Sequence, residues 1–592
     1  MDEQIFSPLD HQFARFMVRQ SGLSGAAADS FKLLSKRLSA SLAAGHSCLE
    51  LTRDEEQVLR ECSDELVSPE LTTPLVLWQG RLYLQRYYRY ELRLAEQLKA
   101  MAKVQYPVPG HSCGRSSAIP GSNDTGPGKR SEAKTPALAC DSRTALDDCF
   151  GREEGADWQR QAAEMALQRP LAIISGGPGT GKTSTVARIL GLLLLTLGPD
   201  LQIALAAPTG KAAMRLRESI ARNREGLPFS PFIQEKIPTS ASTLHRLLGV
   251  RRHSPLFRHN HANPLPWDVV VVDEASMVDL AMMSKLVDAL KPGARLILLG
   301  DKDQLASVES GAILADCIQA LPENTVTLQK SYRFNQEISA FAQAVNSNNS
   351  TAAWAMLSTD MQGATTERSL QILQEPLPGF IVAQYIRYME KVVALSGNAR
   401  PEEHMQQLFQ ALNRFRVLCA TRRGPRGVAT INHQVEQSLA SVGYPCQPGS
   451  WYPGRPVMIL NNDYGLNLFN GDIGICLPDR TAPSTAYPGS SFKVWFEDEE
   501  GSLRGYQPYR LPACETVFAM TIHKSQGSEF AEVLVVLPTN DSPLLTRELI
   551  YTGVTRAQTR VLIASDQAIF NGAINRAISR SSGLHAMLTH SG

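Results

Sequence analysis

The sequence predicts an α/β protein with a helical N-terminal region, two units built on parallel sheets, and a small β insertion. From about residue 137 onward, short apolar strands alternate with helical stretches, which is typical of parallel sheets covered by helices on both faces. Residues 1–104 place apolar side chains three and four residues apart, the spacing of helices. Short β-like segments separated by turns fill residues 450–515, which indicates an antiparallel barrel inserted into the second α/β unit.

Length and composition are those of a multidomain globular protein. The chain has 592 residues, 43% hydrophobic and 20% charged, and a net charge of +1. Such a length suggests roughly three to five domains, and the composition excludes wholesale disorder. The nearly neutral total also excludes a protein that coats nucleic acid through bulk positive charge, although local basic surfaces remain possible.

The ten cysteines are scattered, and no two form a CxxC pair, so the sequence predicts neither a zinc ribbon nor an iron–sulfur cluster. The first residues, MDEQIFSPLDHQFARF, lack the charged and apolar regions of a signal peptide. The most apolar run, 189–197, is about half of the ~20 residues that span a bilayer. We therefore expect a cytoplasmic protein.

The N-terminal region contains an aromatic and basic segment at 78–90, WQGRLYLQRYYRY. It is either a stacking platform for nucleic acid or a helix whose tyrosines pack on a core or a partner. Residues 105–136 are rich in Pro, Gly and Ser and have no periodicity, which predicts a flexible interdomain linker. The candidate strands beyond it are 171–175, 203–207, 269–272, 295–299, 417–420, 533–537 and 560–564.

A glycine-rich segment between a predicted strand and a predicted helix satisfies GxxxxGK[ST]. Its glycines let backbone N–H groups surround a phosphate at a helix N-terminus. Lys182 would reach the β- and γ-phosphates of ATP, and Thr183 would ligate Mg²⁺. The alternative, a merely structural turn, fits this complete motif poorly. The predicted nucleotide-binding residues here are Gly176, Gly177, Pro178, Gly179, Thr180, Gly181, Lys182, Thr183 and Ser184.

A carboxylate pair, Asp273 and Glu274, follows the predicted strand 269–272. The C-terminal end of a parallel strand is where such a fold needs a second Mg²⁺ contact and a water activator. We assign Asp273 to the metal and Glu274 to orienting and deprotonating the attacking water; a solvated acidic turn is the alternative. Gln304, after strand 295–299, could sense the γ-phosphate, although alone it would be an ordinary loop residue.

Two arginines, Arg333 in QKSYRF and Arg556 in YTGVTRA, are candidates to stabilise the charge that develops on a transferred phosphoryl group. Taken singly, either would be read as a surface ion pair. Their assignment depends on the motif set described next.

The ordered motifs resemble those of superfamily 1 helicases, in the branch that moves 5′ to 3′ on single-stranded DNA. They are GGPGTGKT (176–183), APTGKAAMRL (207–216), STLHRLLG (242–249), VVDEAS (271–276), GDKDQLASVESG (300–311), QKSYRF (329–334), MTIHKSQGSEF (520–530) and YTGVTRA (551–557). Together with DWQRQAA (157–163), GRPVMILNN (454–462) and LFNGDIG (468–474), they are similar to the RecD family, the alpha subunits of exodeoxyribonuclease V. The resemblance covers about three-quarters of the chain, from residue 157 onward.

That resemblance implies two RecA-like motor domains, at 137–340 and 341–592, with ATP and Mg²⁺ in the cleft between them. Gln159 would read adenine, and Gln526, Gly527 and Glu529 would line the cleft. The insertion would be an SH3-like subdomain beside the DNA channel. Residues 1–104 would dock on RecB-like and RecC-like partner subunits in a heterotrimer. The implied contacts with single-stranded DNA are Pro208, Thr209, Lys211, Thr243, His245, His523 and Lys524.

A basic stretch at 215–266 carries nine Lys and Arg against three Glu, a net charge of +6. It is either a small insertion that lies along or splits the duplex, or a solvated basic face. Because the sequence contains no nuclease carboxylate constellation that we can identify, we expect any nuclease activity to belong to a partner. Two alternatives remain: a stand-alone helicase of the same superfamily, and an ATP-binding regulatory subunit that no longer translocates.

Overall fold

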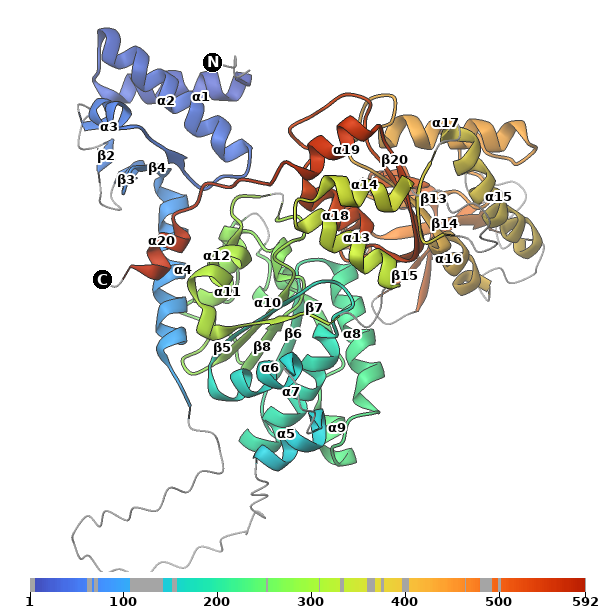
Figure 1. Cartoon of the computed structure of the whole chain (residues 1–592), viewed down its shortest axis with the longest axis horizontal. Coiled ribbons are helices and arrows are strands. Elements are labelled where there is room, and N and C mark those ends of the chain that lie inside the picture. Colours follow the sequence, from blue (N-terminus) through green and yellow to red (C-terminus); the bar gives the residue numbers. More distant parts are fainter. Residues whose placement is uncertain are drawn as a thin grey trace, which may run out of the picture.

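The computed structural model shows an N-terminal unit and two sheet domains, joined at the C-terminus by a segment that runs back across the molecule (Figure 1). The described residues are 6–60, 66–68, 73–106, 142–151, 157–251, 254–307, 309–330, 335–358, 368–373, 377–396, 404–463, 465–479, 492–498 and 502–590. Most of the predicted linker, 107–136, lies outside them. No helix within the described ranges is long and apolar enough to cross a membrane.

The N-terminal unit combines helices with a small sheet. Its helices are α1 (Pro8–Ser21), α2 (Gly25–Ala43), α3 (Arg53–Arg60) and α4 (Gln85–Lys103), and its strands, in sheet order, are β1 (Leu49–Glu50), β4 (Arg81–Leu84), β3 (Leu75–Trp78) and β2 (Val67–Ser68). Helix α1 begins at Ser7, which forms a reciprocal capping box with Asp10. The helical prediction is confirmed, but the sheet was not foreseen, because strands of two to four residues are too short to display a period.

The aromatic segment 78–90 forms strand β4 and the start of α4. Tyr83 and Tyr88 are buried and meet edge to face, with ring centroids 5.3 Å apart. Both belong to a core shared with the first sheet domain. These rings therefore pack inside the protein, which supports the packing interpretation over a stacking platform.

The first sheet domain is built on six parallel strands. In sheet order they are β10 (Thr325–Leu328), β5 (Leu171–Gly176), β9 (Arg295–Gly300), β8 (Val269–Val272), β6 (Ile203–Ala207) and β7 (Ala241–Thr243). Its helices are α5 (Ser142–Phe150), α6 (Trp158–Gln168), α7 (Lys182–Leu197), α8 (Gly210–Arg224), α9 (Pro231–Lys236), α10 (Leu244–Leu248), α11 (Leu280–Asp288) and α12 (Ile313–Ala320).

Both faces of this sheet are buried, which is why its strands read as continuous apolar runs. Along β8, Val269 and Val271 enter the core that contains α7, while Val270 and Val272 enter the core on the other face. That second core also contains buried side chains of α4 from the N-terminal unit. The N-terminal unit is thus part of the covering of the first sheet.

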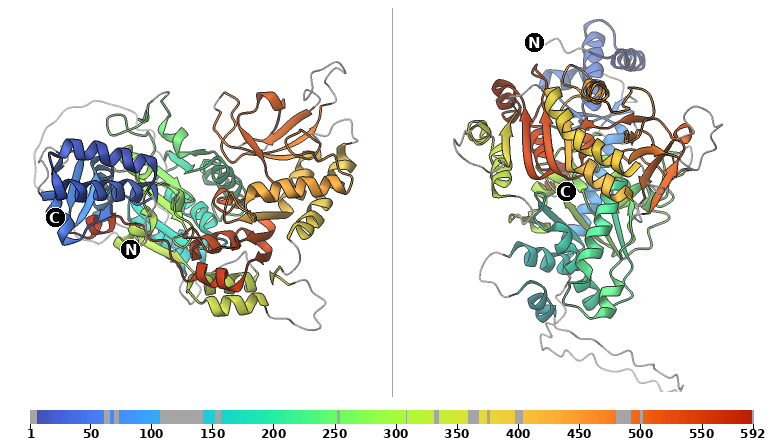
Figure 2. Two further views of the ribbon diagram at one scale, coloured as in Figure 1. Left: turned by 90° about the horizontal axis from the view of Figure 1, so that it is seen from above. Right: turned by 90° about the vertical axis from the view of Figure 1, so that its right-hand side faces the viewer.

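The second sheet domain is built on five parallel strands. In sheet order they are β11 (Leu370–Ile372), β20 (Ala557–Ala564), β19 (Phe530–Val536), β12 (Phe415–Cys419) and β18 (Ala519–Thr521). Its helices are α13 (Gln336–Asn346), α14 (Ser350–Ser358), α15 (Leu377–Ser396), α16 (Met405–Arg414), α17 (Val428–Ser441), α18 (Arg547–Val554) and α19 (Gln567–Ile574). This domain and the N-terminal unit lie on opposite sides of the first sheet domain (Figure 2).

The insertion is an antiparallel sheet with a small core of its own. Its strands, in sheet order, are β16 (Leu503–Tyr506), β15 (Phe492–Glu497), β14 (Ile473–Pro478), β13 (Pro456–Ile459) and β17 (Cys514–Thr516). The predicted antiparallel insertion in the second unit is therefore confirmed, but its strand order is open, with no pairing of the described edge strands β16 and β17, and does not form the closed barrel that was predicted.

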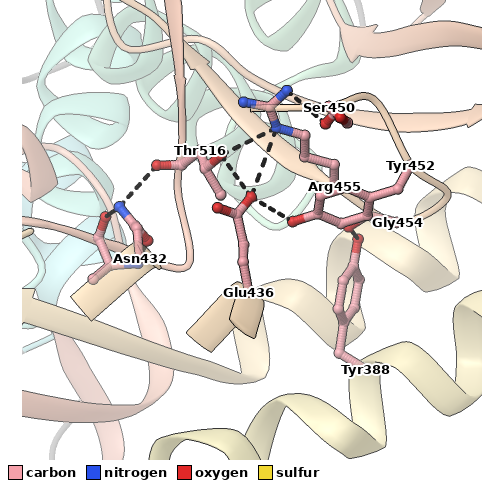
Figure 3. Close-up of polar contacts among 9 residues, drawn as sticks. Tyr388, Asn432, Glu436, Ser450, Tyr452, Gly454, Arg455 and Thr516 are labelled. Atoms are coloured by element: carbon pink, nitrogen blue, oxygen red, sulfur yellow. Dashed lines mark hydrogen bonds and ion pairs between the residues drawn. The ribbon is translucent and has the colours of Figure 1, made fainter. Parts of the chain in front are cut away.

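A buried polar network fixes the insertion to α17 at the point where its first and last strands meet (Figure 3). Glu436 accepts hydrogen bonds from Tyr452 Oη at 2.7 Å and Thr516 Oγ1 at 3.0 Å. Arg455 Nε donates to Thr516 Oγ1 at 3.0 Å, and Asn432 Nδ2 donates to Thr516 O at 2.8 Å. Because these groups are paired with one another, the root of the insertion is rigidly attached to the second sheet domain.

Residues 577–590, which we call the C-terminal strap, leave α19 and cross to the N-terminal unit (Figure 1). The strap ends in α20 (Leu584–Thr589), which packs between α4 and α12. Glu91 of α4 is buried against it and accepts hydrogen bonds from Ser582 Oγ and from Gly583 N. The end of the chain thus joins the second sheet domain to the other two units.

Candidate nucleotide and DNA site

The glycine-rich loop lies between β5 and α7, as its motif requires. Gly181 precedes α7 with φ of 82°, a left-handed conformation that favours glycine. A Cβ on Gly181 would lie 2.7 Å from Gln159 Nε2, and one on Gly176 would lie 2.7 Å from Thr180 Oγ1 and 3.1 Å from Leu328 Cβ. The loop therefore needs glycine at both positions, and its backbone remains open to a phosphate.

Lys182 folds back onto this loop. Its Nζ donates to Gly176 O at 2.5 Å and to Gly177 O at 3.0 Å. The ammonium thus lies where an anion in the loop would meet it, with backbone carbonyls as its present partners. This arrangement fits a phosphate-binding loop, since a phosphate oxygen would be a stronger acceptor than either carbonyl.

Asp273 and Glu274 follow β8, next to the glycine-rich loop. Asp273 is desolvated, and this burial together with the charge of Glu274 raises its pKa to about 6, while Lys182 opposes the rise. Glu274 has φ of 51° and donates its backbone N–H to Asp273 Oδ1 at 2.9 Å. A positive φ at a non-glycine residue is a strained conformation that clusters at functional sites, and two adjacent carboxylates are suited to a cation.

Gln304 and Arg556 bring the two sheet domains into contact at this site. Arg556 is 3% exposed, and its Nη2 donates to Gln304 Oε1 at 2.6 Å. Gln304 Nε2 in turn donates to Asp301 Oδ2 at 3.2 Å. Their motifs predicted Gln304 and Arg556 as separate site residues; the fold makes them direct neighbours. Arg333 lies outside the described residues.

Asp301 and Tyr551 form a second bridge between the sheet domains that the sequence analysis missed. Tyr551 Oη donates to Asp301 Oδ2 at 3.0 Å. Burial raises the pKa of Asp301, and the charge of Lys182 opposes the rise. The available signal was the position of Asp301 at the C-terminal end of β9, where a parallel sheet carries its functional side chains.

The predicted cleft residues of the second sheet domain face the first. Gln526 Nε2 donates to Leu305 O at 2.9 Å, and Glu529 pairs with Arg215 of α8 at 3.2 Å. The position of a Cβ on Gly527 lies 3.5 Å from Ala212 Cβ. All three residues therefore lie at the interface of the two sheet domains, although Gln526 contacts the protein backbone in this conformation.

Gln159 lies at the other end of the site with partners that were not predicted. Asp157 caps α6, and Arg188 Nη1 donates to Gln159 Oε1 at 2.8 Å. The Arg188 guanidinium also lies over the Phe150 ring, 5.2 Å from its centroid. Arg188 thus orients the Gln159 amide so that its Nε2 faces the glycine-rich loop.

These groups line one cavity of about 1000 Å³ between the sheet domains. Its walls include Phe150, Gln159, Pro178, Gly179, Thr180, Gly181, Lys182, Thr183, Ser184, Arg188, Arg215, Asp273, Glu274, Gln304, Glu529 and Arg556. In the part of the chain that the structure describes, no group of three or more His, Cys, Asp or Glu side chains could hold a metal ion. Residues that the sequence separates by more than 370 positions therefore share one nucleotide-sized space.

The predicted DNA contacts of the first sheet domain lie at one edge of its sheet. Ala207 of β6 pairs with Thr243 of β7, which brings Pro208 and Thr209 beside Thr243. The hydroxyls of Thr209 and Thr243 accept hydrogen bonds from Ala212 N and Arg246 N as helix caps. Their side-chain oxygens therefore already have helix-capping roles.

Lys211 and His245 differ in their surroundings. Burial, with Arg416 and Arg215 nearby, lowers the pKa of Lys211 to about 7, and Asp472 opposes this. Lys211 also lines a small cavity of about 120 Å³ between α8 and the insertion. His245 meets Phe257 edge to face at 5.7 Å, and burial lowers its pKa.

In the second sheet domain, His523 and Lys524 follow the edge strand β18 and are half-buried. Lys524 pairs with Glu515 of the insertion at 3.6 Å, and burial lowers its pKa. Burial also lowers the pKa of His523. Lys524 thus contacts the root of the insertion, and the contact of both residues with DNA remains a prediction.

The basic stretch 215–266 forms the end of α8, then α9, β7, α10 and a loop held by two isolated bridges, Val250 with Phe257 and Asn260 with Asn263. Val250 and Leu256 expose 46% and 61% of their surface there. The small insertion predicted within this range, and its action on a duplex, both remain predictions.

Comparison with known proteins agrees with this geometry. The family described as "RecBCD enzyme subunit RecD, N-terminal domain" matches residues 2–69, "AAA domain" matches 159–310, and "UvrD-like helicase C-terminal domain" matches 516–564. The RecBCD enzyme subunit RecD of Mycolicibacterium smegmatis is 44% identical over 447 residues, 74% of this chain and 76% of that protein. The chain belongs to the RecD family.

Other members of the RecD family cover more of the chain. The RecBCD enzyme subunit RecD of Mycobacterium tuberculosis is 41% identical over 543 residues, 89% of this chain and 84% of that protein. The ATP-dependent RecD2 DNA helicase of Deinococcus radiodurans is 30% identical over 84% of this chain and 57% of that protein. A solved structure of Bacteroides Pif1 bound to single-stranded DNA overlaps with a TM-score of 0.38 and 15% identity, over 71% of this chain and 94% of that one. The fold of this chain was described above from its own strand order, not from this overlap.

Proposed function

We propose that this RecD-family chain is an ATP-dependent DNA helicase that moves 5′ to 3′ on single-stranded DNA. It would act as one motor of a helicase–nuclease complex in double-strand break repair and homologous recombination. The observation that carries the proposal is the contact of Arg556 with Gln304 beside the glycine-rich loop, because it makes the nucleotide site depend on both sheet domains. The names of the relatives support it, and the polarity is carried over from the family resemblance.

ATP bound with Mg²⁺ supplies a phosphoanhydride whose hydrolysis releases free energy. Thr183 and Asp273 would hold the metal ion, and Lys182 would exchange its two carbonyl partners for phosphate oxygens. Glu274, on its strained backbone, would orient the attacking water and accept its proton. Arg556, from the second sheet domain, would stabilise the negative charge that develops on the transferred phosphoryl group. Gln304 holds the guanidinium in place.

The gain and loss of these contacts would change the distance between the sheet domains, which then act as two motor domains. Their DNA-facing residues would be those at the adjacent sheet edges: Pro208, Thr209, Lys211, Thr243 and His245 on one side, and His523 and Lys524 on the other. Contacts to phosphates are independent of base sequence, as translocation along any strand requires.

The N-terminal unit would dock on RecB-like and RecC-like subunits. Three large apolar side chains of α1 and α2 are exposed: Leu9 by 72%, Phe16 by 59% and Leu33 by 50%. Leu9 and Phe16 are seven residues apart and thus share one face of α1. We also propose that the chain acts in the cytoplasm, where thiols such as those of its seven described free cysteines stay reduced.

The decisive experiment is Lys182→Gln in the full chain. We expect it to abolish DNA-stimulated ATP hydrolysis while the circular dichroism spectrum and thermal midpoint stay unchanged. Full DNA-stimulated turnover by this variant would overturn the assignment of the nucleotide site. If the wild-type chain binds ATP without moving on DNA, the regulatory-subunit alternative is favoured instead.

Polarity and partnership need their own measurements. Preferential opening of duplexes with a 3′ single-stranded tail would contradict the 5′-to-3′ assignment. A tagged pull-down followed by mass spectrometry should recover two larger subunits; their absence would favour a stand-alone helicase.

A further inference from the structure

Arg580 of the C-terminal strap lies where all three units of the protein meet. Its Nη1 donates to Gly45 O at 2.9 Å, in the N-terminal unit, and to Glu309 O at 2.5 Å, in the first sheet domain. Its Nη2 donates to Ser307 O at 2.7 Å. Arg580 itself follows the last helix of the second sheet domain. One guanidinium thus binds backbone carbonyls from two units while belonging to a third.

Neighbouring backbone bonds close the same junction. Gly311 N donates to Gly45 O at 3.0 Å, and Ser47 N donates to Ser581 O at 3.0 Å. Gly45 has φ of 87°, and a Cβ there would lie 2.3 Å from Arg580 Nη1. Glycine at 45 is therefore required for the arginine to reach its carbonyls.

The other two carbonyls that Arg580 binds, those of Ser307 and Glu309, lie in the segment after β9. We call its described residues, 301–307 and 309–311, the site loop. The same loop carries Asp301 and Gln304, which bond directly to Tyr551 and Arg556 at the interface of the two sheet domains. Ser307 is three residues after Gln304, and Ser307 Oγ also donates to Glu309 O at 3.0 Å. Arg580 does not line the cavity; its hydrogen bonds reach the nucleotide site through the loop, and its charge adds to burial in lowering the pKa of His523.

The part of the strap between the second sheet domain and this junction is short, so the junction cannot move independently of that domain. Arg576 is anchored there by hydrogen bonds to Asp541 Oδ2 at 2.7 Å and Ser542 O at 2.7 Å. Four residue steps separate Arg576 from Arg580, and such a segment spans at most about 14 Å when fully extended. A displacement of the second sheet domain at this edge is therefore transmitted to Arg580 and to the site loop.

We propose that Arg580 is a positioning residue for ATP hydrolysis: it holds the site loop, and through it Gln304, against the N-terminal unit and the strap. This inference rests on the proposed ATPase function. Three donor contacts in a planar fork explain why an arginine is needed, because a lysine ammonium on a flexible stem cannot reproduce that geometry. The N-terminal unit, through Gly45, becomes part of the support of the nucleotide site.

The test is Arg580→Ala in the full chain, measured as ATP hydrolysis with saturating single-stranded DNA. We expect kcat to fall about tenfold while KM for ATP stays within about twofold, because the side chain is outside the cavity. Arg580→Lys should give an intermediate kcat. The matched control is Arg169→Ala, since Arg169 also joins the N-terminal unit to the first sheet domain, through Ala102 O at 3.4 Å, but precedes β5 at the opposite end of the sheet. Its kcat should equal that of the wild type.

Gly45→Ala provides a second, independent variant because it displaces the guanidinium from the other side. The double variant should be no slower than the slower single variant, since both act by removing or displacing the same guanidinium. A kcat of Arg580→Ala within twofold of the wild type, or an equal loss in Arg169→Ala, would overturn the inference. A wild-type chain without DNA-stimulated hydrolysis would instead overturn the proposed function.

Discussion

Arg556 of the second sheet domain donates a hydrogen bond of 2.6 Å from Nη2 to Oε1 of Gln304 in the first sheet domain. The same guanidinium donates to Thr552 O and Ser528 O, so it is held on both sides of the cleft. The amide nitrogen of Gln304, Nε2, donates to Asp301 Oδ2. The guanidinium of one domain is thus held by a polar side chain of the other.

Arg556→Ala should lower the kcat of DNA-stimulated ATP hydrolysis by a factor of about 10³, because an arginine at the transferred phosphoryl group contributes on that order. Gln304→Ala should cost less, since the guanidinium keeps two carbonyl partners. Steady-state hydrolysis by both single variants and the double variant forms the check. Because Gln304 acts through Arg556, the double variant should resemble Arg556→Ala alone; additive losses would contradict the relationship.

Tyr551→Phe should weaken closure of the cleft around ATP. It removes the hydrogen bond to buried Asp301 and leaves that carboxylate with one donor fewer, at a cost of about 1–3 kcal/mol. We expect KM for ATP to rise about tenfold. Tyr452→Phe is the matched control, since it removes a similar bond to buried Glu436 far from the cavity. It should leave KM unchanged; an equal rise in both variants would mean that stability alone is being measured.

The affinity of the chain for single-stranded DNA should fall as pH rises above about 7. Desolvation lowers the pKa of Lys211 to about 7 in the DNA-free protein, so its amine is charged below that pH and increasingly neutral above it. A bound phosphate favours the charged form, so binding takes up a proton, with a loss of at most about tenfold per pH unit.

Fluorescence anisotropy at constant ionic strength, between pH 6.5 and 9, measures this dependence. Lys211→Met should weaken binding at pH 6.5 and flatten the slope. Arg217→Gln is the matched control: it removes another positive charge from the same helix and should keep the slope. An unchanged slope in Lys211→Met would show that Lys211 does not meet the phosphates.

Glu91→Gln should stabilise the protein at alkaline pH. Burial raises the pKa of Glu91 from 4.5 to about 7, so its contribution to the free energy of unfolding is fully present below pH 4.5 and is lost as pH rises through about 7. The loss is on the order of 3 kcal/mol. A glutamine can donate to the hydroxyls of Ser47 and Ser582 and accept from Gly583 N, because hydroxyls serve as donors or acceptors.

The difference in thermal midpoint between Glu91→Gln and the wild type, measured from pH 5 to 8.5, tests this point. The thermal midpoint of the variant minus that of the wild type should increase by several degrees from pH 5 to pH 8.5. A difference that does not change with pH would mean that Glu91 is ionised in the folded protein throughout.

The sequence predicted best those features that depend only on residues adjacent in the chain. The glycine-rich loop, Asp273 with Glu274, and seven of the parallel strands are each specified by residues adjacent in sequence, since strand burial and phosphate binding need only a short segment. Strands such as β7, β10 and β11 were missed because they are short or only partly apolar. Asp301, Tyr551, Arg188 and Phe150 were missed because each becomes meaningful only through a partner elsewhere in the chain.

The sequence by itself determined that this protein has two parallel-sheet domains, an antiparallel insertion and a phosphate-binding loop, because apolar periodicity and glycine placement are local properties. Only the tertiary structure decided that Gln304 holds Arg556, that Tyr83 and Tyr88 are core residues, and that the chain's last segment returns to the N-terminal unit. Those contacts join residues tens to hundreds of positions apart. Their geometry follows from how the sheets and helices pack, which no single segment encodes.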